Sequence, residues 1–158
     1  MAELKIIDDT TMLESAVIFQ RNIKLYAPTK RIKRSTSIAK VSGRGNSRFV
    51  TVRIKAPEAR AFAYGSGIHS TKGPRKPYPI VPRRGTRNRK GKAALYFYWE
   101  KMGQTFVGQK VMHPGVAPTG YIDKAKKDSQ KEIRKLMKDN AVKNIRTYLK
   151  VEFGKVSK

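Results

Sequence analysis

The sequence predicts an α+β protein, in which an antiparallel β-sheet is covered by an N-terminal helix and a long C-terminal helix, with an extended basic loop. Three observations favour this class. Helical periodicity lies at the two ends of the chain, alternating apolar residues lie between them, and turn-like segments separate the alternating runs. We expect one domain over residues 1–158, because a chain of 158 residues has the size of a typical single domain.

The first element is a helix that we expect to begin near Thr11 and to end before Pro28. Thr11 and Glu14 have the spacing of a capping box, and proline cannot occupy a helix interior. Asp8 and Asp9 precede this segment, where negative charge suits a helix N-terminus. The apolar face that we expect to be buried comprises Leu13, Ala16, Val17, Gln20 and Ile23.

A charged connector over residues 29–37 leads to a predicted β-hairpin. Its strands are expected at 37–42 and 48–55, where apolar and polar residues alternate in the second strand. Residues 43–46, with two glycines and an asparagine, form the expected hairpin turn.

The strongest strand prediction is 93–99, which is rich in aromatic residues. Residues 105–112 are its expected hairpin partner, and the preceding segment 58–67 suits either a short helical turn or a strand. Tyr96 and Tyr98 lie on one face of the strand. The opposite face carries Leu95, Phe97 and Trp99.

A long helix is predicted from about residue 121 to residue 152, followed by a flexible tail over 153–158. At 1.5 Å per residue this helix measures about 45 Å, so we expect it to extend beyond a small sheet and its end to suit subunit contacts. Its apolar stripe comprises Ile122, Ala125, Ser129, Ile133, Leu136, Met137, Ala141, Ile145, Tyr148 and Leu149.

The strong positive charge of the chain points to a negatively charged partner. Lys and Arg total 36 against 11 acidic residues, for a net charge of +25, which costs stability through self-repulsion unless a polyanion or an acidic surface is near. A membrane partner is not expected, because no apolar run approaches the ~20 residues of a spanning helix.

Residues 70–92 form the predicted basic loop, with four prolines, three glycines and no acidic residue. Its apolar stretch at 77–82 suits an edge strand. Arginines can bind phosphates through paired hydrogen bonds, and aromatic side chains in the following strand could stack on bases, although they more often pack in a core. The candidate contacts to DNA or to an acidic partner are Arg83, Arg84, Arg87, Arg89, Lys90 and Lys92.

The segment "KVMHPGVAPTGYIDKA" (110–125) raises the question of catalysis, because His113 is one of only two histidines. A general base needs an acid or nucleophile within reach, and a metal ion needs companion ligands. Only His69 exists besides His113, cysteine is absent, and no carboxylates have catalytic spacing. We therefore expect no enzyme, no cofactor and no metal site, and we interpret His113 as a hydrogen-bonding residue of a turn stiffened by two prolines. The candidate subunit-interface turn comprises His113, Pro114, Gly115 and Pro118.

Several short motifs resemble one family, the tail-completion or head–tail joining proteins of long-tailed bacteriophages, which include minor tail components and neck-ring proteins. The segments "NIKLYAP" (22–28) and "EARAFAYGSGIHS" (58–70) are similar to the end of that family's first helix and to its glycine turn. "PYPIVP" and "KAALYFYW" are similar to its strand pair. The His-Pro-Gly turn at 113–115, followed by Tyr121, Ile122 and Ala125, is similar to its entry into the last helix.

This resemblance implies a structural virion protein that forms a hexameric ring in the neck. Such a ring completes or terminates the tail, joins it to the head-side connector and lets DNA pass. The implied partners are copies of the chain, the tail tube or terminator protein, the connector or stopper proteins and, without sequence specificity, genomic DNA. The implied location is the virion, after assembly in the host cytoplasm. An RNA-binding protein of ribosomal type is the alternative that explains the charge, whereas a nuclease lacks the clustered carboxylates it would need.

Overall fold

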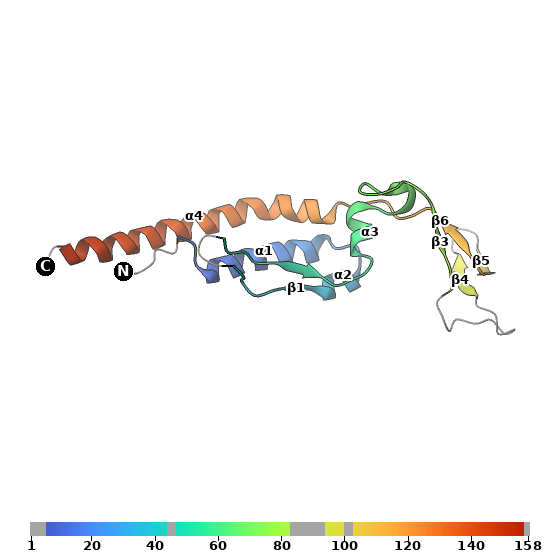
Figure 1. Cartoon of the computed structure of the whole chain (residues 1–158), viewed down its shortest axis with the longest axis horizontal. Coiled ribbons are helices and arrows are strands. Elements are labelled where there is room, and N and C mark those ends of the chain that lie inside the picture. Colours follow the sequence, from blue (N-terminus) through green and yellow to red (C-terminus); the bar gives the residue numbers. More distant parts are fainter. Residues whose placement is uncertain (1–5, 44–46, 83–93, 100–102, 157–158) are drawn as a thin grey trace. The chain divides into compact units, whose positions relative to one another are not determined.

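The computed structural model describes residues 6–43, 47–82, 94–99 and 103–156, with side chains for all of these except 99 and 154–156. The chain divides into two compact units, which are residues 1–59 with 120–158 (unit 1) and residues 60–119 (unit 2). The predicted α+β class is confirmed, since an N-terminal and a long C-terminal helix pack with small antiparallel sheets (Figure 1). Single-domain organisation over 1–158 stays a prediction.

Unit 1 is built around two long helices that lie side by side, α1 (Asp9–Tyr26) and α4 (Tyr121–Val156) (Figure 1). The side-chain oxygen of Asp8 accepts a hydrogen bond from the Thr11 N–H at 2.7 Å, so the helix begins before the predicted capping box. At its other end Ala27 is extended, as expected of a residue that precedes proline. α4 continues to Val156, past the end predicted at residue 152.

The seam between α1 and α4 includes small and polar side chains that are buried. Asn22 Nδ2 donates to Ser129 Oγ at 2.8 Å, and Ser129 Oγ donates to the Ala125 carbonyl at 2.7 Å. Ala125 and Ser129 are fully buried. Arg21 and Glu132 form an exposed ion pair at 2.6 Å, which contributes little in water. Small side chains let the two helices approach closely, and the buried polar groups bond to each other.

The predicted buried face of α1 is wrong in part. Ala16 and Ile23 are buried as expected, but Leu13 is 40% exposed and Val17 is 53% exposed. The buried residues of α1 also include Thr11, Ser15 and Asn22, which hydrophobicity alone would assign to the surface. Their polar groups reach partners, so burying them is inexpensive, and α1 is rotated relative to its apolar pattern.

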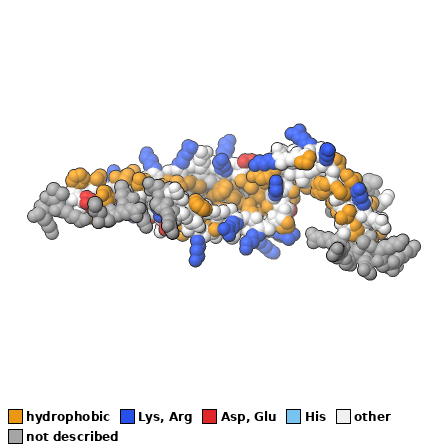
Figure 2. Space-filling view, in the orientation of Figure 1, with side chains coloured by type: hydrophobic (Ala, Val, Ile, Leu, Met, Phe, Trp, Pro, Cys, Tyr) orange, Lys and Arg blue, Asp and Glu red, His pale blue; other side chains and the backbone are white. Residues whose placement is uncertain are grey.

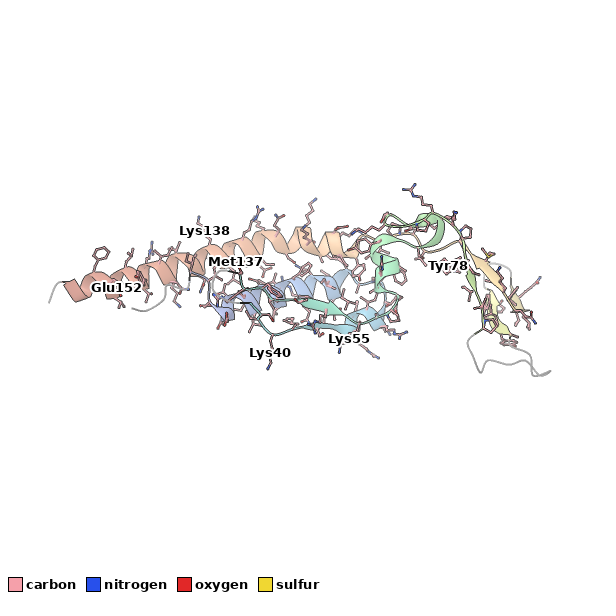
Figure 3. All side chains as sticks on the ribbon, viewed as in Figure 1. Lys40, Lys55, Tyr78, Met137, Lys138 and Glu152 are labelled. Atoms are coloured by element: carbon pink, nitrogen blue, oxygen red, sulfur yellow. The ribbon has the colours of Figure 1, made fainter. Side chains whose placement is uncertain are left out.

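A short hairpin packs beside α1, formed by β1 (Thr36–Ile38) and β2 (Val52–Ile54). The pairs are Thr36 with Ile54 and Ile38 with Val52, and a bridge between Ser42 and Phe49 continues the ladder. Lys40 and Lys55 point away from α1 (Figure 3). The predicted pairing is confirmed over these residues, while the turn at 43–46 lies outside the described residues.

The predicted connector at 29–37 is instead partly helical. Helix α2 (Lys30–Ser35) begins after Thr29, whose hydroxyl oxygen accepts a hydrogen bond from the Ile32 N–H at 3.2 Å. Ile32 is fully buried. The threonine cap and the buried side chain of Ile32 stabilise this short helix. It was not predicted because the residues on either side of Ile32 are charged.

The described residues of unit 2 form short elements: α3 (Ala59–Tyr64, beginning at the last residue of unit 1), the 3-10 turn η1 (Gly67–His69) and four strands. β3 (Tyr78–Ile80) pairs with β6 (Val111–His113), and β4 (Leu95–Trp99) pairs with β5 (Gln104–Gly108), both antiparallel. The predicted edge strand within 77–82 is therefore confirmed.

The predicted strand 105–112 is two strands. After Gly108 the chain bends at Gln109 and changes partner from β4 to β3. Each pairing in the described residues thus belongs to a separate two-stranded sheet, where the sequence predicted one sheet. A ladder of three to five residues is too short to build a wide sheet by itself, so packing against other elements has to support it.

Candidate functional site

The His-Pro-Gly turn begins where β6 ends. Gly115 donates its N–H to His113 Nδ1 at 2.9 Å, which is the hydrogen bond to a loop backbone that the sequence predicts for this histidine. The His113 ring also lies against Tyr78, its cross-strand neighbour in β3, with ring centroids 5.4 Å apart (Tyr78 is labelled in Figure 3). These two contacts hold the imidazole ring in place, so we interpret His113 as a residue that stabilises the turn.

The turn is closed against the segment Gly65–His69, which the sequence predicts only as a turn. Ile68 N–H donates to the Pro114 carbonyl at 2.7 Å, and Ser66 N–H donates to the Val116 carbonyl at 2.9 Å. Val116 N–H returns a bond to Ser66 Oγ at 3.0 Å. The two segments, about fifty residues apart in sequence, therefore hold each other by reciprocal hydrogen bonds.

Glycine is required at the closest approach of these segments. Gly115 has φ +111°, and a Cβ there would lie 1.8 Å from the Ser66 carbonyl oxygen. Gly67 has φ +60°, and a Cβ there would lie 2.0 Å from the Pro114 oxygen. The Gly-Ser-Gly and His-Pro-Gly motifs are thus two halves of one clamp, which we call the glycine clamp (residues 65–69 and 113–116). In the sequence each motif indicates a turn by its glycine, and nothing in it indicates that the two turns pair.

The two histidines of the chain have different surroundings. His113 Nδ1 accepts a backbone hydrogen bond, and His69, the other histidine, is exposed at the end of η1. Within the described residues, no three acidic, histidine or cysteine side chains gather in a way that could hold a metal ion. The role of His113, Pro114, Gly115 and Pro118 at a subunit contact stays a prediction.

The basic candidates Arg83, Arg84, Arg87, Arg89, Lys90 and Lys92 all lie outside the described residues. Their described neighbours in the chain are β3 on one side and β4 on the other. On β4 the tyrosines are exposed, Tyr96 by 76% and Tyr98 by 62%, opposite Val107 and Thr105 of β5. The alternation predicted for 93–99 is therefore seen, and its tyrosine face meets solvent.

Apolar side chains are exposed on elements of both units (Figure 2). In unit 1 they lie mainly on α1 and on the C-terminal part of α4, with Phe49 beyond the hairpin strands, and in unit 2 mainly on or next to the strands. The most exposed are Val17, Leu25, Phe49, Val81, Tyr96, Tyr98, Val107, Met112 and Phe153.

Comparison with protein-family models, with curated proteins and with solved structures found no match. The resemblance to tail-completion proteins thus rests on the sequence motifs alone. Over the part of the chain that is described, no helix combines the length and the apolar character needed to cross a bilayer.

Proposed function

We propose that this chain is a structural virion protein that forms a ring at the head–tail interface of a tailed bacteriophage. The observation that carries the proposal is the exposed apolar surface on both units, which suits a protein that is buried on assembly. Val17, Tyr96 and Val107 are each more than half exposed, on three different elements.

A ring requires two different surfaces of one subunit to meet, so that contacts repeat head to tail and close. Elements of both units offer such surfaces, and the glycine clamp fixes the local course of the chain between β6 and the residues before α4. The net charge of +25 per chain suits a passage for DNA or contact with acidic neighbours. No chemical step is required of this protein.

The test is to locate the chain in particles. Antibodies against the purified protein should label the head–tail junction of intact phage in electron micrographs, and particles made without the chain should accumulate as separate heads and tails. Recovery of the chain with ribosomes, and its absence from purified particles, would contradict the proposal.

The second candidate is an RNA-binding protein of ribosomal type, which the exposed Tyr96 and Tyr98 favour. Exposed aromatic rings beside a basic segment can stack on unpaired bases. Replacing both tyrosines with serine should then lower affinity for single-stranded RNA by about tenfold or more, since stacking contributes about 1–3 kcal/mol per base. Under the ring proposal the same variant binds RNA as the wild type does.

A further inference from the structure

The C-terminal part of α4 extends past the N-terminal end of α1 (Figure 1). Hydrogen bonds from Asn140 and Asn144 join α4 to Asp8 and Ile6, just before α1. Asn140 Nδ2 donates to Asp8 Oδ2 at 3.0 Å, and Asn144 Nδ2 donates to the Ile6 carbonyl at 3.2 Å. The helix continues for about three more turns to Val156.

Three apolar side chains form a stripe on this extension. Val142 is 39% exposed, Ile145 is 38% exposed and Leu149 is 44% exposed. Their spacing of three and four residues puts them on one helix face. At 100° per residue this face lies roughly 150° around the axis from Asn140 and Asn144. The stripe is therefore separate from the seam with α1, and we call it the α4 stripe (Val142, Ile145 and Leu149).

Basic side chains border the α4 stripe. Val142 lines a shallow groove together with Lys138, Lys143, Arg146 and Lys150. Figure 3 shows Lys138 on the side of α4 away from α1 and Met137 on the side toward it. Asp139 is the single acidic residue in this lining. Val142 is the residue of the α4 stripe that lines this groove, so these cations lie next to the stripe at Val142.

We propose that the α4 stripe docks an acidic amphipathic helix of a different protein. Such a helix places its apolar residues on the stripe and its carboxylates beside Arg146 and Lys150, so charge and apolar surface match together. A second copy of this chain fits poorly. It would bring the same excess of cations to the contact, and with the stripes face to face and antiparallel Arg146 meets the same arginine of the other copy. A nucleic acid would satisfy the cations but would leave the apolar side chains without a partner.

This inference uses unit 1 only and does not depend on the proposed function. The probe is a synthetic amphipathic helical peptide with leucines on one face and glutamates beside them, and its counterpart carries lysines in place of the glutamates. Binding to the full-length protein is measured by fluorescence anisotropy at moderate salt. The acidic peptide should bind at least about tenfold more tightly than the basic one.

Two variants test the surface itself. The double change Ile145→Ser with Leu149→Ser should weaken acidic-peptide binding by about tenfold or more, whereas Leu25→Ser, at a residue of α1 that is 65% exposed, should leave it unchanged. Arg146→Glu with Lys150→Glu should reverse the preference between the peptides. Circular dichroism checks that each variant keeps its helical content.

Three outcomes would overturn the proposal. The first is equal binding of both peptides. The second is that the wild-type protein binds vesicles of anionic lipid, and that the Ile145→Ser, Leu149→Ser variant loses this vesicle binding but still binds the acidic peptide. The third is a dimer in sedimentation that the same variant abolishes, which would assign the stripe to a second copy.

Discussion

At the scale of single residues, Asp8 is the most strongly perturbed acid that the structure describes. The hydrogen bond from the Thr11 backbone N–H, followed by the bond from Asn140, lowers the pKa of Asp8 from its ordinary value of 3.8 to about 2. The pKa of Asp8 is lower in the folded state than in the unfolded state. The stability that the ionised Asp8 carboxylate contributes is therefore complete above pH 3.8. It is lost as the pH falls from 3.8 through 2.

We predict that Asp8→Ala costs about 1–2 kcal/mol of stability at neutral pH, since it removes the helix cap. Asp8→Asn keeps a capping oxygen and should cost less. Urea denaturation of the three proteins from pH 7 to pH 2 checks this. The difference between wild type and Asp8→Asn should shrink below about pH 4. A difference that stays constant down to pH 2 would contradict the assigned cause.

The glycine clamp gives a second prediction at this scale. Gly115→Ala should destabilise unit 2 by about 3 kcal/mol or more, because a side chain at this φ collides with the Ser66 carbonyl. Gly103→Ala is the matched control. Gly103 also has a positive φ, +61°, but its Cβ would find open space among the described residues, so the cost should be only about 1–2 kcal/mol.

Hydrogen exchange at the amides of Ser66, Ile68 and Val116 measures this effect locally. Gly115→Ala should accelerate exchange at all three, since their N–H groups donate across the clamp. Gly103→Ala should leave them unchanged. If both variants accelerated amide exchange equally, the glycine clamp would not depend on the close approach of Gly115 to the Ser66 carbonyl.

At the scale of secondary-structure elements, the seam between α1 and α4 depends on a buried polar pair. Ser129→Ala leaves the Asn22 amide without its acceptor, so we predict a loss of about 1–3 kcal/mol. Asn22→Ala should cost a similar amount, and the double variant should cost less than the two together, by about 0.5 kcal/mol or more. Denaturant unfolding of the four proteins measures the coupling. Strict additivity would show that the pair contributes nothing, and Lys126→Ala on the exposed face is the neutral control.

The elements that were predicted well from the sequence have a periodic pattern of apolar residues and a proline or turn where the element ends. Both long helices and the strand at 95–99 are of this kind, because proline or a turn bounds each of them. Which face a helix buries was harder to predict. Hydrophobicity assigned Leu13 and Val17 to the core and left Asn22 out of it. Asn22 is buried because Ser129, a residue of the predicted stripe of the last helix, accepts its hydrogen bond.

The pairing of segments remote in sequence was hidden for a different reason. Gly65–His69 and the turn at 113–116 contact through backbone groups, and backbone groups are the same in every residue. Likewise β6 separates from β5 because β3 offers its own backbone edge beyond Gly108. Side-chain patterns identify such segments as turns or strands, but the choice of partner depends on the tertiary fold.

At the scale of the whole molecule, the positive charge is the property that most constrains function. If the basic segment at 83–92 contacts DNA, replacing Arg83, Arg84, Arg87 and Arg89 with serine should weaken DNA binding. It should also reduce the dependence of affinity on salt. The slope of log affinity against log salt falls by about 0.9 for each phosphate of a duplex that the protein no longer neutralises.

A second variant with Lys124, Lys126, Lys127 and Lys131 changed to serine removes the same charge from the exposed face of α4. Titration of both variants with duplex DNA at several salt concentrations separates a local contact from a diffuse field. Equal weakening in the two variants would show that only net charge matters, and a flat salt response in the wild type would leave an acidic protein as the partner of this segment.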